Sequence, residues 1–256
     1  MPNSARTRAR GTNAFFLPNG GSLQTLIPGS EINAFGINDT GNIVGQFTSG
    51  DNTPGFILGN STSSTFTTIN QPTGVTSDVI NAQGINNNGL VVGFDLGNDG
   101  QVHGFTAKMP ASPGVITAMP VADPLIPGVP GEPGATFVFS QLLGINDNGR
   151  AVGYYGDSTT SQHGYFYNTG TGTYTFLDDP SAAFHNGVEI TQITGINNSG
   201  EIAGFYTDAN GTFHSFVATP TPEPGSLLSA GFGLGAVGLI CFWRQRKVRS
   251  DSAMSV

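Results

Sequence analysis

The sequence predicts an all-β protein, a propeller-like array of four four-stranded repeats followed by one C-terminal transmembrane helix. Three observations support this prediction. The 256 residues include 38 glycines and 16 prolines but only 10% charged side chains, a composition that favours many short strands joined by tight turns. One sequence pattern occurs four times along the chain, and an uncharged apolar run covers residues 226–243.

The N-terminal segment, residues 1–12, is basic and is expected to be disordered. It has no apolar stretch of the length that a secretory signal peptide needs. The repeats then occupy residues 13–218.

Four segments within the body align without gaps: GINDTGNIVGQF from Gly36, GINNNGLVVGFD from Gly84, GINDNGRAVGYY from Gly144 and GINNSGEIAGFY from Gly195. They are 48, 60 and 51 residues apart, a period typical of propeller blades and other repeat arrays. A second marker follows three of them, in the segments that begin with His103, His163 and His214; Pro54-Gly55-Phe56 replaces it in the first. A Thr-rich apolar stretch comes next in most units.

Each unit is therefore predicted to contain four short strands. The GF strand carries the second marker, and the TxI strand lies in the Thr-rich stretch, at 66–72, 115–124 or 174–180. The other two are the strand that ends in GIN and the strand that carries the apolar pair and its glycine. Counted in this order, the body has four complete units and a surplus GF strand at 214–218. A ring of four blades, closed through its N-terminal strands, is one interpretation. The other is a larger ring whose first blades are missing.

The Asn-x-x-Gly spacing after each GIN strand predicts a tight turn, because Asn and Gly tolerate positive φ and Asn side chains bond nearby backbone groups. The predicted turn residues are Asn38, Gly41, Asn86, Gly89, Asn146, Gly149, Asn197 and Gly200.

The strand after each turn is apolar on both faces, which predicts burial between two neighbouring sheets. One face carries Val44, Val92, Val152 and Ala203, and the other carries Ile43, Val91, Ala151 and Ile202. The glycine that follows, at 45, 93, 153 and 204, marks a place where a backbone or a large side chain comes close.

This pattern, GIN-x-x-G with two apolar residues and a glycine, then HGF, resembles the extracellular HAF-type repeat family over residues 13–218. The resemblance implies a repeat architecture and says almost nothing about activity.

The C-terminal part predicts a membrane anchor. Residues 219–225 form a Pro-rich linker, and the uncharged run 226–243, at about 1.5 Å per residue, is long enough to cross a bilayer as a helix. The basic tail 244–256 should stay in the cytoplasm and place the body outside. Its basic cluster consists of Arg244, Arg246, Lys247 and Arg249.

The order of Pro222-Glu223-Pro224, apolar span and basic end resembles the PEP-CTERM sorting domain. That resemblance implies recognition of Pro222, Glu223 and Pro224 by an exosortase, a membrane-embedded cysteine transpeptidase of Gram-negative bacteria that usually make exopolysaccharide. Family members normally begin with a signal peptide, which this N-terminus lacks. We expect the true start to lie upstream; the alternative is a tail-anchored protein with its body in the cytoplasm.

The charge pattern excludes nucleic acid as a partner. Residues 11–225 carry 16 acidic groups but only Lys108 and Arg150 as bases, and phosphate binding needs clustered cations. An acidic body suits solubility outside the cell.

Three kinds of chemistry are conceivable for the body. His103, His163 and His214 hold equivalent positions and are weak candidates for a three-histidine metal site, with turn residues as the favoured interpretation. The Asn/Asp-rich turns resemble calcium loops in composition but lack their spacing. The pair Asp178-Asp179 offers carboxylates for hydrolysis, although no nucleophile elbow, phosphate loop or HExxH motif occurs.

We therefore expect an exported, non-catalytic surface or matrix protein that is associated with exopolysaccharide and biofilm and needs no cofactor. The alternatives are a carbohydrate-binding propeller, with Tyr154, Tyr155 and Tyr165 as exposed stacking residues, and an exported polysaccharide-degrading enzyme.

Overall fold

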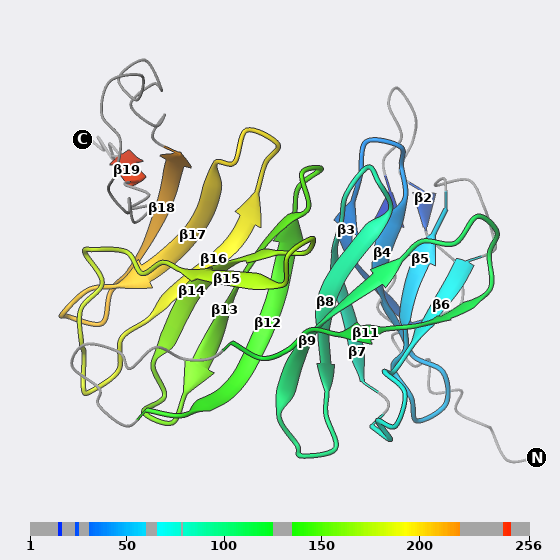
Figure 1. The fold of residues 1–256 in the computed structure, drawn as a ribbon, viewed down its shortest axis with the longest axis horizontal. Helices are drawn as coiled ribbons and strands as arrows, with labels where there is room; N and C mark the ends of the chain where they lie inside the picture. The colour runs from blue at the N-terminus through cyan, green and yellow to red at the C-terminus, as the bar shows by residue number, and fades with distance from the viewer. Residues whose placement is uncertain are drawn as a thin grey trace, which may run out of the picture. The chain divides into compact units, whose positions relative to one another are not determined.

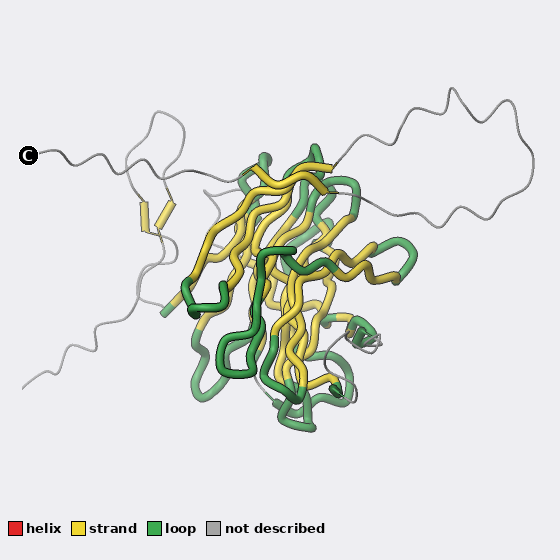
Figure 2. The backbone as a smooth tube through the Cα atoms, turned by 90° about the vertical axis from the view of Figure 1, so that its left-hand side faces the viewer, coloured by secondary structure: helices red, strands yellow, loops and turns green. Residues whose placement is uncertain are grey.

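The computed structural model describes residues 15–16, 24–25, 31–59, 66–77, 79–124, 135–220 and 243–246. Within these ranges all regular secondary structure is β-strand, which confirms the all-β class (Figures 1 and 2). The strands form four sheets of four or five strands and one two-stranded sheet. A closed propeller is not shown by the described residues.

The first repeat sheet is an antiparallel meander of four strands: β3 (Ile32–Ile37), β4 (Ile43–Phe47), β5 (Gly55–Leu58) and β6 (Phe66–Asn70). A fifth strand, β10 (Val115–Thr117), pairs with β6 in parallel. The two-stranded sheet pairs β1 (Phe15–Phe16) with β2 (Gln24–Thr25).

The other three sheets repeat the meander. The second contains β7 (Ile80–Ile85), β8 (Leu90–Leu96), β9 (Val102–Lys108) and β11 (Met119–Pro120). The third contains β12 (Phe137–Ile145), β13 (Arg150–Asp157), β14 (Gln162–Asn168) and β15 (Thr173–Phe176). The fourth contains β16 (Thr191–Ile196), β17 (Ile202–Thr207), β18 (Phe213–Pro220) and β19 (Trp243–Arg246).

The predicted grouping of strands into units was wrong in its starting point. Each of the four repeat sheets begins at the GIN strand, which is followed by the strand with the apolar pair and then by the GF strand. The segment 214–218 therefore lies in β18, the third strand of the fourth sheet, and is not surplus. Periodicity alone cannot fix this starting point, because every circular permutation of a repeat has the same period.

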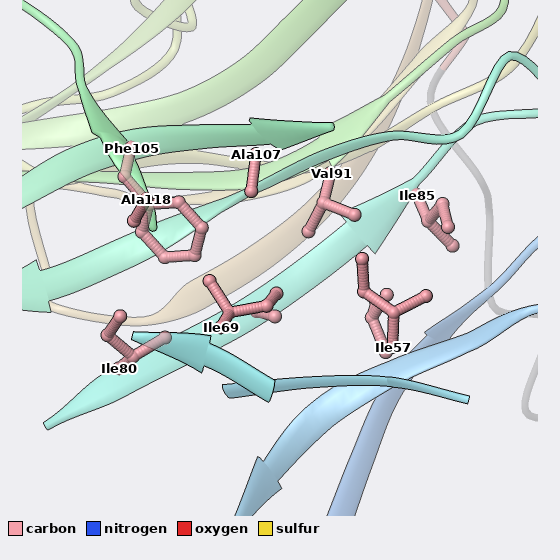
Figure 3. Packing of buried hydrophobic residues seen from close by; sticks show 10 residues of the cluster. Ile57, Ile69, Ile80, Ile85, Val91, Phe105, Ala107 and Ala118 are labelled. Carbon is pink, nitrogen blue, oxygen red and sulfur yellow. The ribbon is translucent and has the colours of Figure 1, made fainter. Parts of the chain in front are cut away.

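The chain divides into two compact units, Met1–Asp123 with Phe139–Gly144, and Pro124–Val138 with Ile145–Val256. In the first unit, residues of the first two repeat sheets share one core. Figure 3 shows Ile57 and Ile69 from one sheet and Ile80, Val91 and Phe105 from the other, all at most 1% exposed. Burial of these apolar side chains supplies the main stabilising free energy of such a pair of sheets.

In the second unit, Val152 and Phe166 of the third sheet pack with Ile193, Ile202 and Phe216 of the fourth. Two-sided burial of the strand after the turn is confirmed for Val44, Val92 and Val152, each 0% exposed, and for their neighbours on the opposite face. Ala203 of the fourth sheet is the exception, because it is exposed.

The recurring glycine beside this apolar pair is confirmed as a point of close approach. A Cβ atom on Gly93 would lie 2.0 Å from the carbonyl oxygen of Asn81 and 2.8 Å from the ring of Phe105. Gly45 and Gly204 have equivalent neighbours. The aromatic residue of each GF strand lies directly opposite the glycine in the β ladder, as in the pairs Gly93–Phe105 and Gly153–Tyr165, and the Phe105 ring covers Gly93.

The predicted membrane span, 226–243, lies outside the described residues except for Trp243. In the part of the chain that the structure describes, no helix has the length and apolar character to cross a bilayer. Trp243–Arg246 form β19, which pairs antiparallel with β18.

Candidate functional site

The four predicted turns form as expected. In each, the glycine N–H donates to the carbonyl of the asparagine three residues earlier, at 3.0 or 3.1 Å, and the glycine has a φ between 72° and 83°. The asparagine Oδ1 accepts a second bond from the backbone N–H four residues later, for instance 2.9 Å from Asn42 N to Asn38. The same bond occurs at Asn86, Asn146 and Asn197.

These turns also bond to each other, which the sequence pattern did not predict. Asn38 Nδ2 donates to the carbonyl of Asn86 at 3.0 Å, and Asn87 Nδ2 donates to Asp39 Oδ2 at 2.8 Å. The backbone N–H of Asp39 donates to Asn87 Oδ1 at 2.9 Å. The first and second repeats are therefore joined at their turns by side chains of the repeat signature.

The second unit repeats this ladder with the equivalent residues. Asn146 Nδ2 donates to the carbonyl of Asn197 at 3.1 Å, and Asn198 Nδ2 donates to Asp147 at 2.7 Å. A signal for it was present in the sequence, because the residue after GIN alternates as Asp39, Asn87, Asp147 and Asn198. In both ladders an aspartate thus meets an asparagine amide. The side-chain oxygens of these turns accept hydrogen bonds from neighbouring groups. Calcium binding at the turns stays a prediction.

The three repeat histidines are each bonded to aspartates of their own repeat. His163, which is 1% exposed, has its Nδ1 at 2.9 Å from Asp178 and its Nε2 at 3.6 Å from Asp157. His214 Nε2 lies 2.9 Å from Asp208. Among the described residues no group of three or more His, Cys, Asp or Glu side chains is placed to hold a metal ion.

His103 lies between two carboxylates at the end of the β8–β9 hairpin. Its Nδ1 is 3.0 Å from Asp123 and its Nε2 is 3.1 Å from Asp99. Burial alone would lower the pKa of His103, but its hydrogen bonds to Asp123 and Asp99 outweigh burial, so its pKa is raised.

The carboxyl group opposite His103 in the ladder, that of Asp95, is only 2% exposed. Burial raises the pKa of Asp95 to about 6, although the nearby His103 works in the opposite direction. Two carboxyl groups at hairpin tips, those of Asp99 and Asp208, have lowered pKa values instead. A backbone N–H bond from Gln101 and a bond to His103 lower the pKa of Asp99, and bonds from His214 and Thr212 lower that of Asp208 to about 2.

The tyrosines predicted to be exposed for stacking on sugars are placed differently. Tyr155 and Tyr165 are 2% and 0% exposed. Tyr155 stacks on the ring of His163 at 5.0 Å between centroids, and Tyr165 lies opposite Gly153 in the ladder. Tyr154 is half-buried, and burial raises its pKa. The prediction of exposure was wrong for Tyr155 and Tyr165, because the repeat uses their rings in packing.

Several predicted residues lie outside the described part of the chain, namely Pro222, Glu223, Pro224, Lys247 and Arg249. Arg244 and Arg246 lie in β19, where Arg246 pairs with Val217.

No protein-family model and no curated protein matches the chain, so both family resemblances stay predictions.

Proposed function

We propose that this protein is exported across the inner membrane of a Gram-negative bacterium and held transiently in that membrane by residues 226–243. An exosortase that recognises Pro222-Glu223-Pro224 then releases it to the cell surface or the extracellular matrix. The order of motif, apolar span and basic cluster in the tail supports this proposal.

The repeat body acts in this proposal as a non-catalytic scaffold in a biofilm matrix rich in exopolysaccharide, with its sheets arranged as blades of a propeller-like array. The observation that carries this role is the ladder between turns. Within each compact unit, the residues that define the repeat bond to the neighbouring repeat, as Asn38 and Asp39 do, so the repeat signature joins sheets in pairs. An extended array offers a broad surface to a polymer, as repeat proteins commonly do.

Processing of the tail tests the proposal. The full chain, with a secretory signal peptide fused before Met1, is expressed in an exosortase-containing Gram-negative strain and in the same strain without its exosortase gene. The expected result is a shortened, surface-exposed protein in the first strain and a full-length, inner-membrane protein in the second. Immunoblots of fractionated cells measure both.

A variant with Pro222, Glu223 and Pro224 all changed to alanine should remain full-length in the exosortase-containing strain, whereas Thr221→Ala should be processed normally. Release of the protein without the exosortase, or with the motif removed, would contradict the proposal.

A further inference from the structure

A pocket of about 500 Å³ lies in the first compact unit, at the end of the first repeat sheet where β4, β6 and the start of β7 meet two loops. Its volume is within the range of about 300–1,000 Å³ that small-molecule sites occupy. Ten of the residues that the structure describes line it, and six of these are polar: Ser49, Asn52, Thr68, Asn70, Gln71 and Ser77. The remaining lining is apolar, with Phe47 as its aromatic member.

Hydrogen bonds to backbone groups hold the two loops of the pocket in place. Ser49 and Asn52 exchange hydrogen bonds across the β4–β5 hairpin at 2.9 and 3.2 Å. Ile80 N donates to the carbonyl of Thr53 at 3.0 Å, and Gln71 Nε2 donates to the carbonyl of Val79 at 2.8 Å. The pocket is therefore largely formed before any ligand arrives, which lowers the entropic cost of binding.

Two polar atoms of the lining residues are shielded from solvent and have no hydrogen-bond partner within the described part of the chain: Gln71 Oε1 and Ser77 Oγ. A buried oxygen without a partner is destabilising, because it has lost its bonds to water and gained none in return. Rotation of either side chain toward the pocket would bring its oxygen within reach of a ligand hydroxyl, which can supply a donor to the Gln71 oxygen and both a donor and an acceptor to the Ser77 hydroxyl.

The first repeat differs from the next two at this place. In those repeats a histidine at the start of the GF strand bonds to an aspartate shortly before a proline, as His103 does with Asp123 and His163 with Asp178. The first repeat has Pro54 instead of the histidine and Asn70-Gln71 before Pro72. The histidine–aspartate pair is thus replaced by residues that do not ionise, and these residues line the pocket.

The chemistry of the lining selects the class of ligand. Among the described residues that line the pocket none is ionisable, so they offer a charged group no counter-charge for its lost hydration. The acidic body adds an unfavourable potential for anions. Amides and hydroxyls beside an aromatic ring match instead a ligand with many hydroxyls and apolar C–H faces.

We propose that this pocket binds a short segment of a neutral glycan chain through Gln71, Ser77 and the amides and hydroxyls around them. The inference rests on the proposed function for its biological setting, an exopolysaccharide matrix. It adds that the polymers bound by the repeat body are neutral glycans.

Isothermal titration of the full chain with hexasaccharides tests the proposal. The probes are the neutral hexamers of glucose (α-1,4 and β-1,4 linked), mannose and galactose, together with hexagalacturonate as the anionic counterpart. At least one neutral hexamer should bind, and hexagalacturonate should bind at least tenfold more weakly, a difference of about 1.4 kcal/mol.

Two variants locate the site. Ser77→Leu removes the hydroxyl and fills the pocket without breaking a hydrogen bond, and should weaken binding at least tenfold, about 1.4 kcal/mol. Thr73→Leu adds a similar apolar side chain at an exposed position of the same loop that does not line the pocket, and should leave affinity within about twofold. Circular dichroism and thermal unfolding establish that both variants are folded, and Ser77→Ala offers a milder replacement if Ser77→Leu is not.

Three results would overturn the inference: no binding of any neutral hexamer to the folded chain, equal binding by Ser77→Leu and Thr73→Leu, or a preference for hexagalacturonate. Because titration uses the purified chain, it is independent of tail processing. Normal processing without glycan binding removes this inference alone, whereas glycan binding without exosortase-dependent processing removes the sorting proposal and leaves the pocket.

Discussion

Asn38 uses both ends of its side-chain amide, and this double use explains why asparagine occupies the third position of the GIN signature. Its Oδ1 closes its own turn by accepting from Asn42 N, and its Nδ2 reaches the carbonyl of Asn86 in the next repeat. An aspartate has the acceptor but lacks the donor. The residue after it, Asp39, has no such restriction and alternates with asparagine along the chain.

Asn38→Asp should therefore destabilise the protein by about 1–3 kcal/mol, because it replaces a donor with a carboxylate that faces a carbonyl oxygen. Urea unfolding at neutral pH measures the loss. Asn42→Asp is the matched control, since it introduces the same charge in the same turn, where the Asn42 amide donates to Thr40. Equal losses in the two variants would show that the bond between turns contributes little.

Asp95 makes stability depend on pH. Its folded pKa of about 6 lies above the value of about 3.9 expected in an unfolded chain. The folded state therefore binds more protons between pH 4 and 6, and stability should fall as the pH rises through this window, by up to about 3 kcal/mol. Asp95→Asn cannot ionise, so it should be more stable than the parent at pH 7, with the difference closing at pH 4.

Urea unfolding at pH 4, 5, 6 and 7 measures this effect. His103, whose pKa is raised, adds stability that is fully present below about pH 6.5 and lost as the pH rises through its folded pKa, so its contribution falls in a higher window. If Asp95→Asn loses as much unfolding free energy between pH 4 and 6 as the parent does, groups other than Asp95 cause that loss.

At the scale of the element, the sequence predicted the strands well because the repeat supplies four independent copies of each pattern. The Asn-x-x-Gly turns and the covered glycines occur where expected, and so do the two-sided strands, apart from Ala203. The start of the repeat and the fate of the second TxI segment could not be predicted. Its residues 115–117 pair with β6 of the preceding sheet as β10, and 119–120 return to their own sheet as β11.

The candidate site was less predictable for a physical reason. Residue types indicate what a side chain can do, while its partners depend on which loops the fold brings together. Residue type suggests a surface aromatic at Tyr155 and a metal ligand at His163, yet the two rings stack on each other in the interior of one hairpin. The pocket at Gln71 and Ser77 has no sequence signature, because it arises where the first repeat departs from the pattern of the others.

The GIN glycine provides a test of how the sheets are stacked. A Cβ on Gly36 would lie 2.6 Å from the carbonyl oxygen of Gln83 in the next sheet, whereas a Cβ on Gly195 would meet no atom within 4 Å. Gly36→Ala should therefore cost about 1–3 kcal/mol through overpacking. Gly195→Ala, at the same position of the motif, should change stability by less than about 0.5 kcal/mol. Similar losses in the two variants, measured by urea unfolding, would contradict this account.

At the scale of the whole molecule, residues 243–246 have two mutually exclusive placements. In the structure they form β19, with Trp243 opposite Pro220 and Arg246 opposite Val217 of the repeat body. In the proposed sorting state, the span 226–243 separates them from that body, and the positive charges of Arg244 and Arg246 hold them on the cytoplasmic side. The sequence could not predict the first placement, because pairing at a sheet edge depends on which backbone groups are left available rather than on residue type.

Cysteine labelling distinguishes the two placements in a strain without exosortase, where the tail is retained. Arg246→Cys, in a Cys241→Ser background and with a signal peptide fused before Met1, should react with a membrane-impermeant maleimide only in inverted inner-membrane vesicles. Asp51→Cys, at an exposed position of the β4–β5 hairpin, should react only from the opposite side. If both cysteines react from the same side as the body, residues 243–246 stay paired with β18 and the apolar run does not span the membrane. The tail would then complete the fourth sheet, and the sorting proposal would fail.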